Sequence, residues 1–438
     1  MLVRFDFENF KSYRVENCIS LVSYTKLRTF PAHEKRINSL SILKYSGIYG
    51  NNASGKSTIL EAMKLYRGIV CHQVSKISDF SFKGYEHMPT KLSAVFNIDK
   101  EIYQYSFSIL KTKNKELVIK DEMITVIGSG PRRSKIIYSK KSGIDKSYIE
   151  KENEALIDFI YEGYKSTNRI SNIETLFLSY ATKDDKLVKN SRLSGELSKI
   201  YNYIKNNIVV IGANTTNLNF INREFVEVIN KYITQFDKGL ERVELVDLDE
   251  KEYKDLIPVP IRDDVYKQLN QHAGRGAIIN CNNQTFVFVS KNSNGTFSFC
   301  KLMSKHKYID DMFDFSEESE GTKKFITLMS YFAAQKKGVT FFIDELERSM
   351  HPDACKYLFS FFENECKNTD SQFIFTSHNE RFIKENLRRD EIYFVDKDMY
   401  GGSIVYPQTD FRSVNSTNIA KKFLNGEYKK VSNYGSSL

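Results

Sequence analysis

The alternation of apolar and polar residues divides this chain into strand-rich ends and a helical middle. Residues 43–49 form a short apolar run typical of a buried strand, and 59–66 repeat apolar residues at helical spacing. Between 90 and 128, three segments alternate with a period of two, which predicts a β-meander. From 150 to 240 the spacing of the apolar residues predicts mainly helices.

Strands return after the helical region, and the final segment alternates helices with strands, which is typical of a parallel α/β core. We therefore expect an α/β fold in three parts. Residues 1–128 and 276–438 form the two halves of one core, and residues 129–275 form a mainly helical insertion.

The loop between the first buried strand and the first helix carries candidate phosphate-binding chemistry. It fits the P-loop spacing G-x-x-x-x-G-K-[ST] with Gly50, Asn51, Asn52, Ala53, Ser54, Gly55, Lys56, Ser57 and Thr58. The glycines let the backbone approach phosphates, and backbone N–H groups at the helix N-terminus face the anion. We expect Lys56 to reach the β- and γ-phosphates of a nucleoside triphosphate and Ser57 to bind Mg²⁺. A plain glycine-rich turn would not need the Lys-Ser pair.

A second buried strand, 339–343, ends in two acids, Asp344 and Glu345. Parallel sheets place their ligands at this end of the strands. A P-loop site needs a carboxylate for Mg²⁺ and a group that orients water. We therefore predict that Asp344 holds Mg²⁺ and that Glu345 polarises the attacking water. Two solvent-facing acids are the alternative interpretation, which the upstream P-loop disfavours.

Two further segments complete the candidate site. His378 follows an apolar strand over 372–377 and can hydrogen-bond a γ-phosphate, although a histidine at a strand end is more often structural. Ser319 and Gly321 precede an apolar helix over 325–332, and together they predict a second anion-binding helix N-terminus. The alternative for this segment is an ordinary helix cap.

Composition limits the class of protein. The 438 residues exceed one typical core, and 41% hydrophobic with 27% charged residues is usual for a soluble globular protein. The six cysteines lack C-x-x-C spacing, and no apolar run reaches the about 18 residues of a membrane span. We expect a cytoplasmic protein with no membrane partner.

The net charge of +9 permits nucleic-acid contact but is at least as typical of a lysine-rich solvated surface. Residues 128–134 are predicted to form a loop, and its Arg132 and Arg133 form a local basic cluster. This cluster is able to touch a phosphate backbone, but a solvated turn is the favoured interpretation. Nucleic acid therefore stays an open partner.

In their order along the chain, these motifs resemble an ABC-type ATPase head. More narrowly, they resemble the RecF/SMC-like group and the OLD-type ATPases of bacterial phage defence. Residues 9–12 are similar to the NFKS opening of that group, and the P-loop is similar to its Asn-Asn-Ala-Ser variant. Residues 318–322 resemble its ESxGT signature, and 344–352 its DEIDxSLHP stretch. Residues 376–378 match its TSH motif.

The resemblance implies a fold and an assembly. The fold is a P-loop NTPase head with a parallel core sheet and an antiparallel β subdomain, and Lys11 joins the nucleotide-binding residues. The assembly is a head-to-tail homodimer or a higher homo-oligomer. Ser319 and Gly321 of one subunit complete the P-loop of the other, and Ser349 lies near the seam. ATP closes such a dimer and hydrolysis opens it.

The chain departs from the family pattern at two positions. Arg348 stands where a small polar residue is more usual, and Glu320 stands where many ABC proteins have glycine. Both leave the hydrolysis rate open, since Glu320 brings a carboxylate close to a phosphate. The glutamine that senses Mg²⁺ in ABC heads has no clear counterpart, and Gln104 is a weak candidate.

The C-terminal part favours a separate effector. Residues 423–428 resemble the YLNGRYG ending of stand-alone members that have no fused nuclease. Asp396 and Asp398 have the spelling of a TOPRIM nuclease motif, but only about 60 residues follow His378, fewer than a domain usually needs. We interpret these two acids as a loop after a strand over 392–395, and we expect any nuclease to be a separate protein.

Three functions are compatible with these observations. The one we expect is the ATPase subunit of a bacterial anti-phage system, which senses a trigger and regulates a separate effector. The second is an SMC/RecF-like DNA-binding repair ATPase, suggested by the positive charge, although residues 150–240 lack sustained heptads. The third is a scaffold that binds ATP but scarcely hydrolyses it, suggested by Arg348 and Glu320.

Overall fold

The chain folds into two compact units. Unit 1 comprises Met1–Ile211, Gly338–Leu346 and Asp370–Leu438, and unit 2 comprises Gly212–Lys337 and Glu347–Thr369. The structure, a computed structural model, describes residues 1–24, 27, 29–38, 40–73, 79–112, 114, 116–128, 134–171, 173–183, 191–216, 218, 221–271, 276–281, 285–292, 294–333, 338–378 and 387–410.

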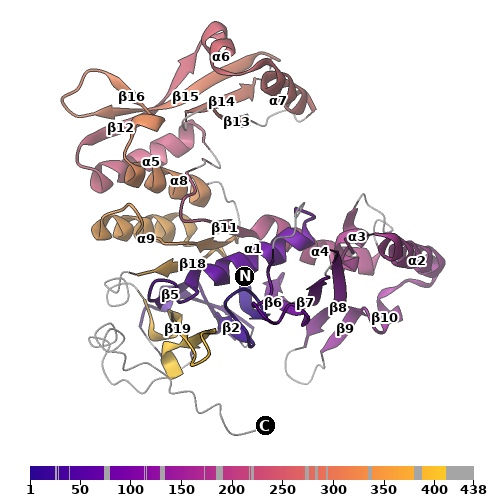
Figure 1. The fold of residues 1–438 in the computed structure, drawn as a ribbon. Helices are drawn as coiled ribbons and strands as arrows, with labels where there is room; N and C mark the ends of the chain where they lie inside the picture. The colour runs from indigo at the N-terminus through magenta and orange to yellow at the C-terminus, as the bar shows by residue number, and fades with distance from the viewer. Residues whose placement is uncertain are drawn as a thin grey trace. The chain divides into compact units, whose positions relative to one another are not determined.

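The core of unit 1 is a sheet with the strand order β11-β17-β18-β5-β19-β20, and only β20 runs antiparallel to its neighbour (Figure 1). These strands are β5 (Tyr45–Gly50), β11 (Ile208–Ile211), β17 (Thr340–Ile343), β18 (Gln372–Ser377), β19 (Ile392–Lys397) and β20 (Ser403–Pro407). Every residue of β5, β17 and β18 is buried, as their apolar runs predict. Their carboxyl ends meet at one edge of the sheet, where the P-loop, the two acids and His378 follow.

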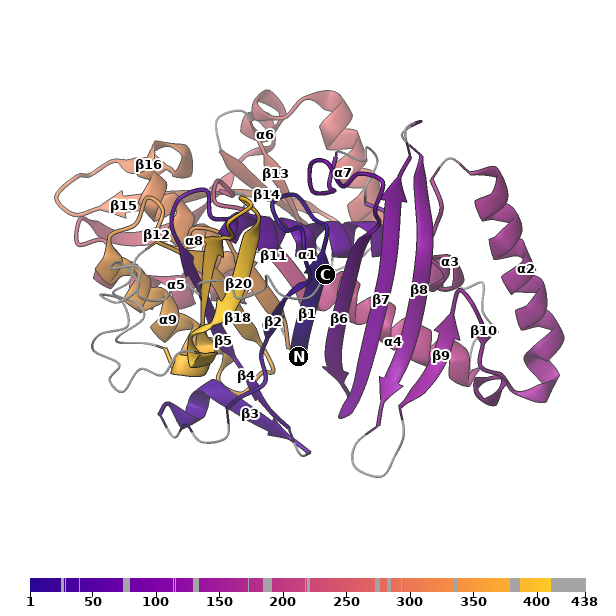
Figure 2. The ribbon, with the colours of Figure 1, turned by 60° about the horizontal axis from the view of Figure 1, so that its bottom comes forward.

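A second sheet in unit 1 has the order β10-β9-β8-β7-β6-β1-β2, with all neighbours antiparallel. Its strands are β1 (Leu2–Glu8), β2 (Asn17–Ser20), β6 (Thr90–Ile98), β7 (Glu101–Lys111), β8 (Leu117–Ile127), β9 (Lys135–Ser139) and β10 (Gly143–Ile144). Strands β6, β7 and β8 confirm the predicted meander (Figure 2). A short hairpin, β3 (Glu34–Ile37) with β4 (Leu40–Leu43), lies outside both sheets.

One face of the antiparallel sheet packs against helices. These are α1 (Lys56–Val70) and α4 (Arg192–Asn207). The ring of Tyr66 on α1 stacks on Phe107 of β7 with 5.2 Å between the ring centroids, and its hydroxyl donates to the carbonyl of Tyr105. Tyr203 on α4 packs against Phe96 of β6. This aromatic layer ties the P-loop helix to the antiparallel sheet.

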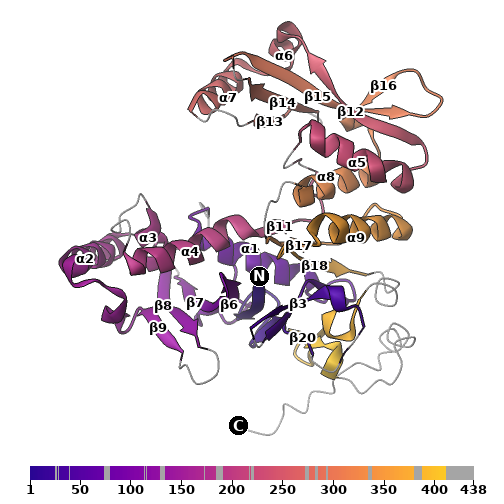
Figure 3. The same cartoon turned by 180° about the vertical axis from the view of Figure 1, so that it is seen from behind.

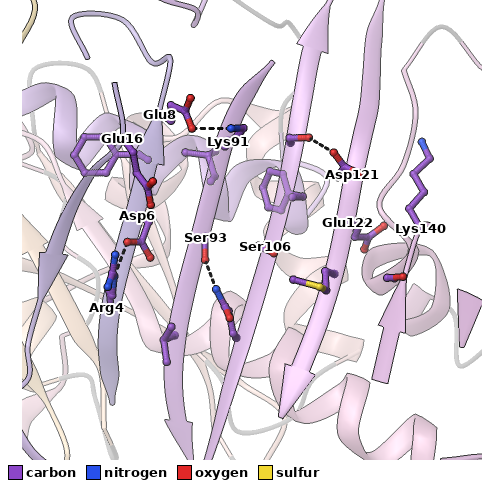
Figure 4. Close-up of a pocket in the computed structure, with 18 of the residues that line it drawn as sticks. Arg4, Asp6, Glu8, Glu16, Lys91, Ser93, Ser106, Asp121, Glu122 and Lys140 are labelled. Carbon is purple, nitrogen blue, oxygen red and sulfur yellow. Dashed lines mark hydrogen bonds and ion pairs between the residues drawn. The ribbon is translucent and has the colours of Figure 1, made fainter. Parts of the chain in front are cut away.

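The other face of the antiparallel sheet carries charged and polar side chains among apolar ones (Figure 4). These side chains line a cavity of about 890 Å³, in which Lys91 pairs with Glu8 at 2.9 Å. The amide of Gln104 donates to the hydroxyl of Ser93 at 3.1 Å. Gln104, the weak candidate for an Mg²⁺ sensor, is therefore engaged within this face.

A buried carboxylate joins the antiparallel sheet to α3 (Phe177–Thr182), which packs against α2 (Glu154–Ile170). Glu122 of β8 accepts hydrogen bonds from the N–H groups of Phe177 and Leu178, at 2.7 and 3.1 Å, and from the hydroxyl of Tyr105 at 2.9 Å. Burial raises the pKa of Glu122 to about 7, although these donors oppose the shift.

A buried ionic cluster fastens the N-terminal part of unit 1 to β19. Arg388 is 1% exposed, and its guanidinium donates to both oxygens of Asp390, at 2.9 and 3.0 Å. It also pairs with Glu34 of β3 at 3.2 Å and donates to the hydroxyl of Ser23 at 2.9 Å. The guanidinium of Arg388 therefore neutralises two carboxylates, those of Glu34 and Asp390, that are far apart from each other in the sequence.

Unit 2 is built on a sheet of the order β12-β15-β14-β13, with β16 also paired to β15. Its strands are β12 (Leu240–Leu248), β13 (Gly276–Asn280), β14 (Phe286–Lys291), β15 (Phe297–His306) and β16 (Met312–Asp314). Its helices are α5 (Arg223–Phe236), α6 (Glu250–Leu256), α7 (Val259–Gln271), α8 (Glu320–Ala333) and α9 (Pro352–Cys366). Figure 3 shows α6 and α7 together at one end of the unit and α5, α8 and α9 at the other.

The predicted α/β fold class is confirmed, with a parallel core sheet and an antiparallel β subdomain. Helices predominate over 129–275, but the compact units divide the chain at other places than the predicted parts. Strand β11, at the end of α4, joins the core sheet, and β12 joins the sheet of unit 2. Asp396, expected in a loop, lies in β19 opposite Ile404. None of the helices in the described ranges is long and apolar enough to cross a bilayer.

The buried Glu122 makes the stability of unit 1 depend on pH. The folded state holds one more proton than the unfolded state between the ordinary pKa of 4.5 and about 7. Its contribution is therefore complete below pH 4.5 and is lost as the pH rises through 7, by about 3 kcal/mol. Urea unfolding at pH 5 and pH 7.5 should show this loss in the wild type and not in Glu122→Gln. Asp121→Asn, which changes an exposed neighbour, should keep the wild-type pH slope, and an equal slope in Glu122→Gln would contradict the assignment.

Removal of the buried cation should destabilise the fold. Arg388→Met leaves the carboxylates of Asp390 and Glu34 without their partner, so we expect the free energy of unfolding to fall by about 3–5 kcal/mol. Chemical denaturation measures this loss. Arg36→Met removes an exposed arginine from β3 and is the matched control. Equal stabilities of the two variants would show that the cluster does not hold β3 to β19.

Candidate nucleotide-binding site

The P-loop connects β5 to α1 in a conformation that needs glycine at two positions. A Cβ atom on Gly50 would lie 2.5 Å from the carbonyl oxygen of Val395 on β19. Gly55, the N-cap of α1, has φ +116°, and a Cβ there would lie 2.5 Å from Oγ of Ser403. Both glycines are therefore required by close backbone packing as well as by access for phosphate.

The second half of the loop is held by hydrogen bonds from side chains to which the sequence analysis gave no role. The hydroxyl of Ser403 on β20 donates to the carbonyl of Ser54 at 2.5 Å and lies 2.9 Å from Oγ of Ser12. The hydroxyl of Tyr13 donates to the carbonyl of Gly55 at 3.0 Å. Burial raises the pKa of Tyr13 well above its usual value, so its hydroxyl stays a donor. These contacts hold the carbonyl groups of Ser54 and Gly55.

Lys56 and His378 converge, as the sequence predicts. Lys56 is 5% exposed, and its ammonium donates to the carbonyls of Gly50 and Asn51 at 2.8 and 2.9 Å. The same nitrogen lies 3.3 Å from Nδ1 of His378. Because it is held by these carbonyls, Lys56 acts as a fixed positive charge beside the P-loop.

Ser57 and Asp344 also meet, and Thr376 joins them. The hydroxyl of Ser57 donates to Oδ1 of Asp344 at 3.0 Å, and that of Thr376 donates to the same oxygen at 2.6 Å. Two neighbouring ligands of an octahedral magnesium ion are about 2.9 Å apart, given metal–oxygen distances of about 2.1 Å. The separation of Ser57 and Asp344 therefore fits the predicted Mg²⁺ site.

Glu345 occupies a strained backbone position, with φ +46° in a region that side-chain-bearing residues rarely adopt. Its N–H donates to the hydroxyl of Thr376 at 2.8 Å. Its carboxylate, 30% exposed, lies 3.9 Å from Nε2 of His378. An anchored backbone with a half-exposed carboxylate suits a group that accepts a proton from water.

The other predicted residues of the loop and the N-terminal motif are placed as follows. Asn51, Asn52 and Ala53 are exposed, whereas Thr58 is half-buried in the first turn of α1. Lys11 is exposed and pairs with Glu61 of α1 at 2.8 Å. Its role toward a nucleotide stays a prediction.

The predicted signature lies in unit 2, at the N-terminus of α8. Oγ of Ser319 accepts from the N–H of Thr322 at 3.1 Å and so caps the helix. A Cβ atom on Gly321 would lie 2.4 Å from the carbonyl oxygen of Ser349, which has φ +63°. Ser319, Gly321 and Ser349 are thus assembled in one place.

The carboxylate of Glu320 is not isolated, because it pairs with the ammonium of Lys323 at 2.8 Å. The ammonium of Lys323 offsets the negative charge of Glu320, the carboxylate that we expected close to a phosphate. Arg348 is exposed. The basic pair Arg132 and Arg133 and the tail motif over 423–428 lie outside the described residues.

Residues 46–384, more than three quarters of the chain, match the family described as "AAA domain, putative AbiEii toxin, Type IV TA system". No curated protein matches the chain.

Solved structures of SMC heads are similar to the chain at low identity. The SMC head domain from Thermotoga maritima is 13% identical, with a TM-score of 0.39, and covers 93% of this chain and 98% of that one. An Smc head with an extended coiled coil, bound to the C-terminal domain of ScpA derived from Pyrococcus furiosus, is 15% identical with a TM-score of 0.43, covering 98% and 99%. An SmcHead bound to the C-winged helix domain of ScpA is 14% identical with a TM-score of 0.42, covering 92% and 96%. Likenesses this distant carry no argument about the site.

Thr376 offers a test of the site geometry. Thr376→Val keeps the shape of the side chain but removes the hydrogen bonds to Asp344 and to the N–H of Glu345. We expect ATP turnover to fall about 10- to 100-fold, because catalytic groups lose their alignment, while ATP affinity changes little. Thr327→Val on α8 is the matched control, because its buried hydroxyl has no hydrogen-bond partner among the described residues. Wild-type turnover in Thr376→Val would show that Asp344 and Glu345 do not depend on this hydroxyl.

Proposed function

We propose that this chain, which belongs to the AAA-domain family that matches residues 46–384, binds ATP with magnesium and hydrolyses it. The observation that carries the proposal is the convergence of five predicted residues at one sheet edge. Lys56 lies beside His378, Ser57 contacts Asp344, and Glu345 follows Asp344 with its backbone fixed by Thr376.

Each residue takes a definite role in this proposal. Lys56 and the loop N–H groups bind the phosphates, and His378 donates a hydrogen bond to the γ-phosphate. Glu345 orients the attacking water and accepts its proton. Ser57 and Asp344 would hold magnesium, which neutralises phosphate charge when bound.

We further propose that two copies of the chain share each nucleotide in a head-to-tail homodimer. The exposed Ser319 caps α8, and the backbone at Gly321 is tightly packed, so the helix presents a rigid N-terminus to solvent. Such an N-terminus attracts an anion. The γ-phosphate held by the partner's P-loop is the anion we assign to it.

The cellular role we propose is that of a regulator in a bacterial anti-phage system with a separate effector protein, most simply a nuclease. It is supported by the family description, which names a putative toxin of a type IV toxin–antitoxin system. The order of the motifs, with no assigned nuclease residues, supports it as well. The alternative is a DNA-binding repair ATPase, which the net charge of +9 favours.

Two substitutions test the ATPase. Glu345→Gln removes the general base, so turnover should fall by about 100-fold or more while ATP still binds and holds the closed dimer together. Lys56→Ala should abolish ATP binding. Phosphate release measures turnover, and light scattering after size exclusion measures the dimer. Glu363→Gln, an exposed carboxylate of α9, is the matched control.

A monomeric Glu345→Gln protein in saturating ATP would contradict the head-to-tail dimer. Turnover measured with and without duplex DNA decides between the two cellular roles. Acceleration by DNA, with a binding constant that falls steeply with salt, would favour the repair ATPase. Slow turnover that ignores DNA, together with an effector that co-purifies, would favour the regulator.

A further inference from the structure

A buried carboxylate stands directly before the signature serine. Glu318 follows the short helix η6 (Phe315–Glu317) and is 7% exposed, whereas the next two residues, Ser319 and Glu320, are exposed. Its backbone is extended, and α8 begins two residues later. A buried carboxylate needs hydrogen-bond donors in place of the water that it has lost.

The donors of Glu318 come from strand β15. Oε1 of Glu318 accepts from Nε2 of His306 at 2.8 Å and from the hydroxyl of Ser304, which is 2% exposed. Ser304 and His306 are two residues apart on one strand, so both face the same side of the sheet. Strand β15 is itself paired with β12 on one side and with β16 on the other. The donors are therefore fixed by the sheet of unit 2.

The residue after Glu318 is anchored to the helix. Ser319 accepts the N–H of Thr322 on its hydroxyl at 3.1 Å, and its carbonyl accepts the N–H of Lys323 at 2.9 Å. Two consecutive residues therefore join two rigid elements, Glu318 to the sheet and Ser319 to α8. Loss of the first anchor would free the hydroxyl of Ser319 and the first turn of α8 to shift together.

We propose that Glu318 is the positioning residue of the signature, and that Ser304 and His306 act through it to aim Ser319 at the nucleotide held by the second subunit. This inference rests on the proposed function, because it takes Ser319 as the group that completes the partner's P-loop. A side chain needed only to fill this space would be apolar, which would cost less to bury than a carboxylate. The carboxylate adds a defined link between the sheet of unit 2 and the signature.

The test begins with the full-length variants Glu318→Ala and Glu318→Gln. Glu318→Ala should lower ATP turnover about 10- to 100-fold, as expected for a displaced group in a catalytic site. Its affinity for a fluorescent ATP analogue at its own P-loop should stay at the wild-type value. Glu318→Gln, whose amide oxygen still accepts from both donors, should retain most of the turnover. Asp311→Ala, an exposed carboxylate in the turn between β15 and β16, is the matched control.

A mixing experiment separates positioning from loss of fold. In a head-to-tail dimer of Glu318→Ala with Lys56→Ala, one composite site pairs an intact P-loop with an intact signature. An equal mixture of these two inactive proteins should therefore regain roughly a quarter of the wild-type turnover, since half of the dimers are mixed and each has one intact site. The mixture of Ser319→Ala with Lys56→Ala should behave in the same way.

The outcomes distinguish the inference from the function on which it rests. Recovery with Ser319→Ala but not with Glu318→Ala would overturn the positioning role alone. No recovery in either mixture would overturn the shared site, and the inference with it. Wild-type turnover in Glu318→Ala would also overturn the inference. If Glu318→Ala does not fold, Ser304→Ala and His306→Ala remove the donors from the other side, and both should then show the same loss and the same recovery.

Discussion

The register of three buried parallel strands is the constraint on which the site depends. Ile343 of β17 lies opposite Phe375 of β18, and Thr376 lies opposite Ile48 of β5. Asp344, one residue beyond β17, therefore reaches the hydroxyl of Thr376, while the P-loop begins at Gly50, the last residue of β5. A slip of one residue would turn the side chains that face the site to the opposite face of the sheet. These strands are buried on both faces, so such a slip would set each side chain against the packing of the opposite face.

Much of this arrangement could be predicted from the sequence, because the signals are local. The apolar runs before Gly50, Asp344 and His378 predict parallel strands, and the P-loop spacing predicts the loop between β5 and α1. The supports of the loop could not be predicted in the same way. Ser403 and Tyr13 have no distinctive spacing in the sequence. They contact the P-loop only because the fold brings β20 and the segment between β1 and β2 back to it. The limits of the two units differ from those of the predicted parts for a similar reason. The short strand β11 follows a helix directly and joins a sheet whose other strands are remote in sequence.

Two strained backbone positions flank the point where the chain passes from unit 1 to unit 2. Glu345 and Ser349 both have positive φ values, of 46° and 63°, and the boundary between the units falls between them, after Leu346. Each conformation costs of the order of 1–3 kcal/mol, so each persists only because its surroundings impose it. For Glu345 the surroundings are Thr376, and for Ser349 they are the close approach to Gly321. Three residues, 346–348, separate the two strained positions along the chain.

The same device fixes a carboxylate at both halves of the proposed composite site. In unit 1 the hydroxyl of Thr376 holds Asp344, and in unit 2 the hydroxyl of Ser304 holds Glu318. In each pair the hydroxyl comes from a strand and the carboxylate from a turn, and the next residue, the partly exposed Glu345 or the exposed Ser319, is one to which we assign a role. Strand register then sets the position of these residues, and the loops only connect them. In the proposed dimer, two subunits built in this way would meet a shared phosphate with both halves already in place, because a sheet is stiffer than a loop, and little ordering entropy would be lost at closure.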